Sequence, residues 1–146
     1  MTKSIRQLVL EMFSSDDYPR AAGCLLQKDG KVLSVSRLDN PDDIGLPGGK
    51  VDPTDADDEA AARRELKEET GLIAGKMRFL YGGVCPGGSD GKAYWFTVYV
   101  VEDWTGEIVQ NETGVIEWVD PSKLLGGSFD DYNRRMLKTL GVIDNE

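Results

Sequence analysis

Short apolar segments separated by polar turns run through most of this chain, which is the pattern of β-strands. Arg20–Gln27 predicts a buried strand, and Lys28–Lys31, with Asp29-Gly30 at its centre, predicts a hairpin turn. The returning strand is then Lys31–Arg37. Further strands are expected within Leu72–Val84, at Ala93–Val101 and at Gly114–Val119.

Helical spacing of apolar residues appears in a few other segments. The clearest predicted helix begins with Asp57 or Asp58 as its N-cap, runs to Thr70 and ends at Gly71, which suits the left-handed position after a helix. The other predicted helical segments are Ser4–Phe13, a turn at Pro121–Leu125, and Phe129–Leu140. The predicted loops are Asp39–Asp43 and the glycine-rich Cys85–Gly91.

The 146 residues contain no internal repeat, low-complexity segment or domain linker, so we expect a single domain over residues 1–146. Strands interleaved with a few helices predict a mixed α+β or α/β architecture. No run approaches the length of a transmembrane helix, and Met1–Glu11 lacks the long apolar stretch of a signal peptide, so we expect no membrane partner. Cys24 and Cys85 are too few for a disulfide framework and favour two ordinary thiols in a reducing cytoplasm.

Charge narrows the function classes. A formal net charge of −9 argues against binding a nucleic acid polymer, which needs a basic surface, although a nucleotide bridged by a metal ion stays compatible with it. The chain contains no histidine. That removes Ser-His-Asp and Cys-His catalysis and histidine-ligated zinc, and leaves carboxylates, Lys, Arg, Tyr, hydroxyls and thiols as the available chemistry.

Three glutamates share one face of the central predicted helix. Glu65, Glu68 and Glu69 are spaced i, i+3 and i+4, so they project together and repel one another by roughly 0.2–0.5 kcal/mol per pair. A bound divalent cation would relieve this repulsion, although similar strings also occur on ordinary solvated helices. Upstream, Gly48-Gly49 can bring backbone close to such an ion because glycine has no Cβ. Mg²⁺ prefers oxygen ligands of this kind.

The whole segment 49–72 resembles the Nudix box, written G-x5-E-x7-R-E-U-x-E-E-x-G-U with U aliphatic. Gly49 opens it, and Arg64 to Leu72 (RELKEETGL) matches every defined position of its second half. One position departs: Asp55 stands where the first glutamate belongs, and eight residues rather than seven separate it from Arg64. In the family this position mainly supports the loop, so we expect the change to be tolerated.

The resemblance implies an α/β/α sandwich around a mixed β-sheet. It also implies hydrolysis of the diphosphate linkage of a nucleoside diphosphate joined to another group, with Mg²⁺ or Mn²⁺. Glu65, Glu68 and Glu69 would be metal ligands together with the Gly48 carbonyl, and Arg64 would orient a glutamate through a salt bridge. The general base is either Glu65 or Glu112, a further metal-ligand candidate that precedes Glu117-Trp118 at the spacing of MutT-type enzymes.

Substrate contacts are implied more thinly. Asn133 falls where MutT-type enzymes have the asparagine that reads the purine edge, and Arg37 falls near a base- or phosphate-contacting position. Gly49 and Lys50 are further expected substrate contacts. The aromatic strand of Tyr94, Trp95, Phe96 and Tyr99 either stacks a base or fills the core.

These residues favour a MutT-like enzyme that converts a nucleoside triphosphate, oxidised purines included, to the monophosphate and pyrophosphate. The alternative is an ADP-ribose or nucleotide-sugar pyrophosphatase, because Pro86 lies close to a proline position of those enzymes. A non-catalytic nucleotide-binding module is disfavoured because all three helix glutamates are present. The sequence leaves the oligomeric state open.

Overall fold

A four-stranded mixed sheet forms the centre of the computed structural model, which describes residues 18–37, 39–86, 91–110, 114–127 and 129–143. Its strand order is β5–β1–β8–β7, with β1 and β8 parallel and the other neighbours antiparallel. The strands are β5 Gly48–Lys50, β1 Arg20–Leu25, β8 Tyr94–Val101 and β7 Met77–Cys85.

A second sheet has the order β10–β3–β2. Strand β2 pairs with the start of β3, and β4 pairs with the end of β3, at Val35–Arg37. A small pair, β6–β9, lies beside the end of the central helix. These strands are β2 Gln27–Lys28, β3 Lys31–Arg37, β4 Asn40–Gly45, β6 Ile73–Ala74, β9 Trp104–Thr105 and β10 Gly114–Val119. The helical segments are α2 Asp58–Thr70, the 3₁₀ turn η2 Pro121–Leu124, and α3 Asp130–Leu140.

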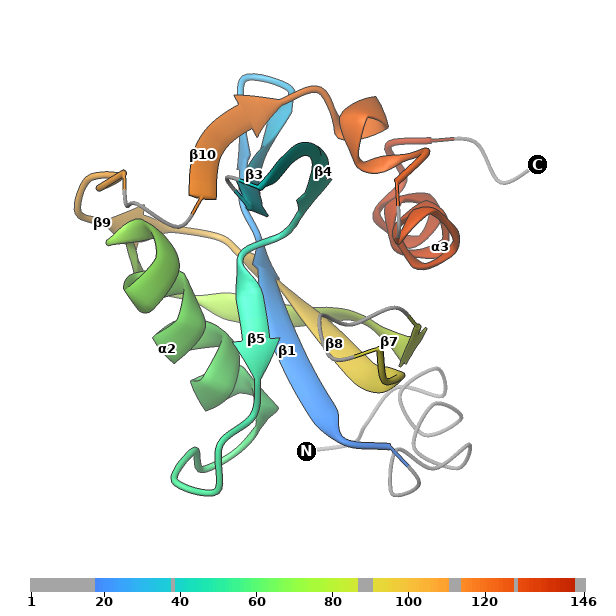
Figure 1. Ribbon diagram of the computed structural model, residues 1–146. Helices are drawn as coiled ribbons and strands as arrows, with labels where there is room; N and C mark the ends of the chain where they lie inside the picture. The colour runs from blue at the N-terminus through green and yellow to red at the C-terminus, as the bar shows by residue number, and fades with distance from the viewer. Residues whose placement is uncertain (1–17, 38, 87–90, 111–113, 128, 144–146) are drawn as a thin grey trace.

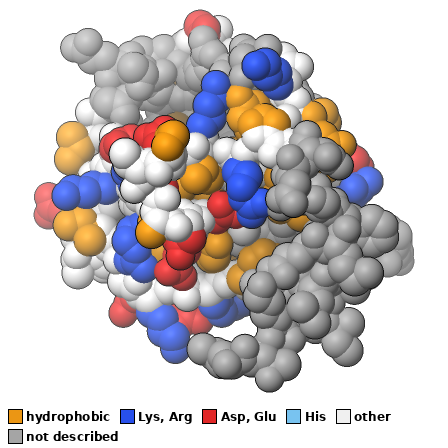
Figure 2. Space-filling model, turned by 90° about the horizontal axis from the view of Figure 1, so that it is seen from below, with side chains coloured by type: hydrophobic (Ala, Val, Ile, Leu, Met, Phe, Trp, Pro, Cys, Tyr) orange, Lys and Arg blue, Asp and Glu red, His pale blue; other side chains and the backbone are white. Residues whose placement is uncertain are grey.

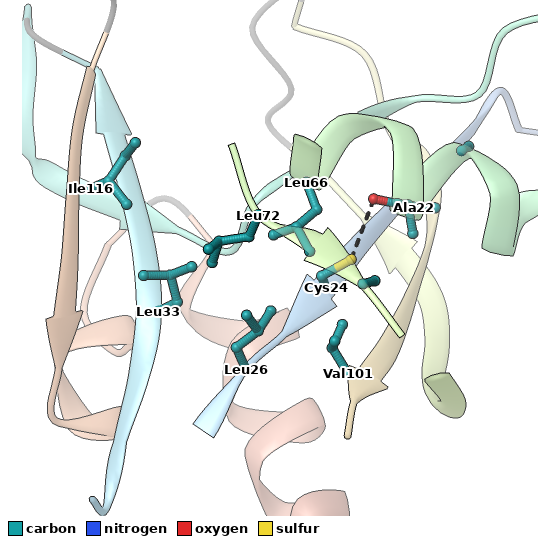
Figure 3. Close-up of a cluster of buried hydrophobic side chains, with 11 residues drawn as sticks. Ala22, Cys24, Leu26, Leu33, Leu66, Leu72, Val101 and Ile116 are labelled. Carbon is teal, nitrogen blue, oxygen red and sulfur yellow. Dashed lines mark hydrogen bonds between the residues drawn. The ribbon is translucent and has the colours of Figure 1, made fainter. Parts of the chain in front are cut away.

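Helices α2 and α3 cover opposite sides of the central sheet (Figure 1), and each side has its own apolar cluster. Successive strand residues point to opposite faces, so β1 sends Cys24 to the α2 side and Leu25 to the α3 side. On the α2 side, Figure 3 shows Leu66 of the helix among Leu26, Leu33 and Leu72, and the Cys24 thiol donates to the Ala62 carbonyl at 3.3 Å. The predicted α/β/α sandwich around a mixed sheet is therefore confirmed.

The predicted bounds of α2 are confirmed in detail. The Asp57 carboxylate accepts a hydrogen bond from the Ala60 N–H at 2.8 Å, so Asp57 is the N-cap. At the other end Gly71 adopts φ 84°, and its N–H donates to the Lys67 carbonyl. Both ends are set by local side-chain and backbone chemistry, which is why the sequence predicted them.

The predicted loop at Asp39–Asp43 is wrong, because Asn40–Gly45 forms strand β4 against β3. The pairing shifts register between Ser36 and Arg37, so an irregularity accommodates a segment whose Asn-Pro-Asp-Asp composition is typical of a turn. Proline lacks an N–H and is tolerated in such a strand, since β4 pairs on one side only among the described residues. The expected helix at Ser4–Phe13 lies outside the described residues.

The two cysteines are free thiols, Cys24 buried and Cys85 half-buried. Burial raises the pKa of the Cys24 thiol to about 12 and that of Cys85 to about 11, so both are neutral at ordinary pH. Within the described part of the chain, no helix has the length and hydropathy needed to cross a membrane.

Candidate active site

The three glutamates of α2 are brought against the short strand β5. The Gly48 N–H donates to the Glu69 carboxylate at 3.0 Å, and the side chain of Glu65 lies directly over Gly49. A Cβ on Gly49 would stand 2.5 Å from the Glu65 carboxyl carbon, and a Cβ on Gly48 would stand 2.6 Å from the Ala22 carbonyl oxygen of β1. Glycine is therefore required at both positions for the helix acids and the sheet to approach so closely.

Arg64 organises the acids from the neighbouring position. Its guanidinium donates to Glu65 at 3.0 Å and to Glu68 at 3.2 Å, and a further N–H reaches the Lys50 carbonyl at 3.1 Å. The predicted salt bridge between Arg64 and a glutamate is thus present twice. Because the fork of Arg is rigid and planar, these contacts fix the glutamates relative to β5.

Asp55 completes this network despite the altered box. It accepts two parallel hydrogen bonds from Arg64, at 3.0 Å and 2.9 Å, and a third from the Asp52 N–H at 2.8 Å. Its side chain is 7% exposed, and the hydrogen bonds from Arg64 hold its pKa below the ordinary value. The shorter acid therefore reaches the arginine in a loop that carries one inserted residue.

Glu69 is the most perturbed of the three acids. Burial raises its pKa to about 7, the Gly48 N–H opposes this, and the charge of Glu65 together with a hydrogen bond to Glu65 adds to the rise. Burial is thus the main cause of the raised pKa of Glu69, and the neighbouring acids Glu65 and Glu68 add to it.

Carboxylate oxygens are the ligands that a hard divalent cation such as Mg²⁺ prefers, so the chemistry of these side chains fits such an ion. Among the described residues, no group of three or more Cys, Asp or Glu side chains is arranged so that it could hold a metal ion by itself. Glu112, the predicted fifth contributor and alternative base, falls in 111–113, outside the described residues. A complete ligand set therefore depends on further oxygens, such as the predicted Gly48 carbonyl, substrate phosphates or water.

A pocket of about 250 Å³ opens beside β5, and its lining includes all three residues of that strand. It brings together three residues predicted to contact substrate: Gly49, Lys50 and Asn133. The rest of its lining is mostly apolar and aromatic: Ala21, Gly45, Leu46, Gly48, Cys85, Tyr94, Phe96, Phe129 and Tyr132. An apolar hollow with a few polar groups at its wall suits a planar base.

The alternation of β8 divides its aromatic residues between the two faces of the sheet. Tyr94 and Phe96 line the pocket, whereas Tyr99 packs against the cluster under α2. Sequence reasoning did not assign Tyr132 to the site. Its ring packs edge-on against Phe96, with centroids 5.5 Å apart, and its hydroxyl donates to the Phe96 carbonyl at 2.6 Å. Its position directly before Asn133 was the available signal.

Asn133 and Arg37 are the other predicted substrate contacts. Asn133 is 5% exposed, and its amide N–H donates to the Leu124 carbonyl at 3.0 Å, which fixes the orientation of the side chain at the pocket. Arg37 pairs with Gly114 through the β3–β10 ladder; its side chain lies outside the described part of the structure.

The family model described as NUDIX domain matches residues 17–140 of this chain. The 8-oxo-dGTP diphosphatase of Haemophilus influenzae is 30% identical over 129 residues, which cover 82% of this chain and 88% of that protein. The ADP-ribose pyrophosphatase of Methanocaldococcus jannaschii is 34% identical over 84 residues, covering 56% of this chain and 48% of that protein.

Among solved structures, the crystal structure of a MutT NUDIX hydrolase from Burkholderia pseudomallei is similar with a TM-score of 0.69. The two proteins are 25% identical, and the match covers 84% of this chain and 97% of the other. This chain belongs to the Nudix family and is a MutT-like Nudix hydrolase.

Proposed function

We propose that the protein is a Mg²⁺-dependent nucleoside triphosphate pyrophosphohydrolase that releases a nucleoside monophosphate and pyrophosphate. The observation that carries this is the placement of β5 between two features. One face of the strand abuts Glu65, and the pocket with its aromatic walls opens beside the same three residues. A base in the pocket would thus place its phosphates toward the acids.

The residues of the site have separate proposed roles in metal binding, positioning and proton transfer. Glu65, Glu68 and Glu69, with the Gly48 carbonyl, would hold Mg²⁺ or Mn²⁺, and Arg64 and Asp55 keep the glutamates in place. The metal would supply neutralisation of phosphate charge and a more acidic water. In the reaction, water adds to phosphorus, a P–O–P bond breaks, and a carboxylate, Glu65 or Glu112, takes the proton of the water.

Two further features support a free nucleotide as substrate. The net charge is −9, and on the face shown in Figure 2 acidic and basic side chains are interspersed. The relative from Haemophilus influenzae is a diphosphatase of 8-oxo-dGTP, which supports an oxidised purine as one substrate. The two neutral thiols support a cytoplasmic location.

The second candidate is hydrolysis of ADP-ribose or a nucleotide sugar, favoured by the partial match to the ADP-ribose pyrophosphatase. A non-catalytic nucleotide-binding module is the third candidate, and the intact set of three helix glutamates speaks against it.

A substrate screen with Mg²⁺ separates these candidates when pyrophosphate, monophosphate and sugar phosphate are all quantified. We expect monophosphate and pyrophosphate in equal amounts from a purine nucleoside triphosphate. Faster turnover of ADP-ribose than of every triphosphate would overturn the proposed subclass. Glu69→Gln should remain folded and lose most activity at saturating Mg²⁺, and full turnover by that variant would refute the proposed metal site.

A further inference from the structure

Helix α2 carries an ion pair at its beginning, apart from the network of Arg64. Asp58, the first residue of the helix, accepts hydrogen bonds from the Arg20 guanidinium. Nε of Arg20 lies 2.9 Å from one carboxylate oxygen and 3.1 Å from the other, and Nη2 donates as well. Thr97 of β8, which is 4% exposed, donates to the same carboxylate at 3.3 Å. The Asp58 side chain is 13% exposed, so it is a mostly buried acceptor with partners on two strands of the sheet.

The backbone of Arg20 is tied to the strands that adjoin the helix acids. Arg20 is the first residue of β1, pairs with Trp95 of β8, and accepts at its carbonyl from the Val51 N–H, directly after β5, at 3.0 Å. Because strand residues alternate, Arg20 projects from the same face of β1 as Ala22 and Cys24, which is the face that α2 covers. The guanidinium therefore links the start of α2 to the edge of the sheet where β5 lies.

Asp58, Glu65 and Glu69 lie along one stripe of α2. Residues seven and eleven positions after Asp58 return to within about 20° of its direction, and Glu65 lies about 10 Å further along the helix axis. The same stripe meets β5, since Glu69 accepts from the Gly48 N–H and Glu65 lies over Gly49. A helix held at its first residue cannot rotate about its axis or slide along the sheet without breaking the bonds of Asp58.

We propose that Arg20 and Asp58 are positioning residues for the metal site: their ion pair fixes the rotation of α2, and thereby the approach of Glu65 and Glu69 to β5. The competing interpretation is purely structural, because an acid in the first turn also stabilises a helix through the helix dipole. The inference rests on the metal site of the proposed function and is independent of which nucleotide the enzyme hydrolyses.

The test is Mn²⁺ binding to the protein without nucleotide, followed by electron paramagnetic resonance of the free ion, since this readout needs no turnover. The variants are Arg20→Gln, Asp58→Asn and the double variant. Each single change should raise the Kd for Mn²⁺ by roughly threefold to tenfold, the range that packed networks transmit between sites. The double variant should bind no more weakly than the weaker single variant, because the two residues act as one unit.

Arg20→Gln separates positioning from the electric field of the pair. Removing a cation near the acids should by Coulomb attraction alone tighten Mn²⁺ binding, whereas loss of positioning should weaken it. Unchanged or tighter Mn²⁺ binding by Arg20→Gln would therefore overturn the inference. Arg20→Lys keeps the cation without the planar fork and should recover part of the lost affinity.

Leu137→Ala controls for stability. Leu137 is fully buried on the α3 side of the sheet, so its truncation should lower the melting temperature without touching the stripe of α2. Its Mn²⁺ affinity, measured below the melting temperature, should equal that of the wild type. An equal loss of affinity in Leu137→Ala and Arg20→Gln would show that affinity merely follows stability, and would overturn the inference.

Turnover provides the second readout. In Arg20→Gln, kcat should fall while the KM for the nucleotide changes little, because neither Arg20 nor Asp58 lines the pocket. If the wild type hydrolyses no nucleotide, the proposed function fails, and the Mn²⁺ affinities still decide the role of the ion pair. If the wild type is active and Arg20→Gln keeps both its kcat and its Mn²⁺ affinity, the inference fails and the proposed function stands.

Discussion

Replacing Glu69 by glutamine should stabilise the metal-free protein at pH 8 and have little effect at pH 4.5. Burial is the main reason that the Glu69 pKa rises from 4.5 to about 7. A carboxylate with a raised pKa binds its proton more tightly in the folded state, so ionisation destabilises the fold. The contribution of Glu69 to the stability of the wild type therefore falls as the pH rises from about 4.5 to 7, and the glutamine variant lacks this loss.

The expected change in the free energy of unfolding follows from the size of the Glu69 pKa shift. At about 1.4 kcal/mol per pKa unit, the shift corresponds to an upper limit of about 3 kcal/mol. Solvent screens part of the cost of the buried Glu69 charge, so we expect the glutamine variant to be more stable than the wild type by about 1–3 kcal/mol at pH 8. Glutamine keeps an acceptor for the Gly48 N–H, which lies 3.0 Å from Glu69, so the variant loses no backbone partner.

Urea denaturation in the presence of a chelator, at pH 4.5 and pH 8, measures the effect as a shift in midpoint. Glu68→Gln is the matched control. The Glu68 side chain is 58% exposed, so replacing it removes a charge that is mostly in solvent and should change stability less. Mg²⁺ should then raise the melting temperature of the wild type more than that of Glu69→Gln. A difference between wild type and Glu69→Gln that is the same at both pH values would refute the reasoning.

Other substitutions test the surroundings of the acids. Asp55→Ala should lower the midpoint of urea denaturation and reduce kcat, because Arg64 loses its paired carboxylate; an unchanged kcat would show that the network does not position the glutamates. Gly49→Ala should lower kcat and have a smaller effect on the melting temperature, since the added Cβ displaces the Glu65 side chain. Steady-state kinetics and thermal melting measure the two effects. Asn133→Ala should raise the KM for a purine nucleotide and cost about 1 kcal/mol for its lost hydrogen bond, measured by kinetics and denaturation.

The elements that the sequence predicted well are those determined by neighbouring residues. The cap by Asp57, the left-handed Gly71 and the alternation of β8 depend on interactions within one segment. The strand β4 was missed for the opposite reason: Asn40–Gly45 has a turn-like composition, and only pairing with β3 makes it a strand.

The site also contains some features that neighbouring residues determine and others that depend on the folded chain. The spacing of Glu65, Glu68 and Glu69 is enough to place them on one helix face, because a helix repeats every 3.6 residues. Spacing does not determine the role of Asp55, since an inserted residue changes where a loop carboxylate points. The folded loop pairs it with Arg64, across nine positions of the chain.

The sequence by itself determined the family, the acid-bearing helix and the glycines that let β5 approach it, because these follow from residue spacing and the missing Cβ. The tertiary structure decided the pocket. Lys50, Tyr94 and Asn133 come from β5, β8 and α3, and long-range strand pairing and helix packing bring them to one cavity. No local pattern encodes which face of β8 meets α3, since that choice is made by burial of the two apolar clusters on opposite sides of the sheet.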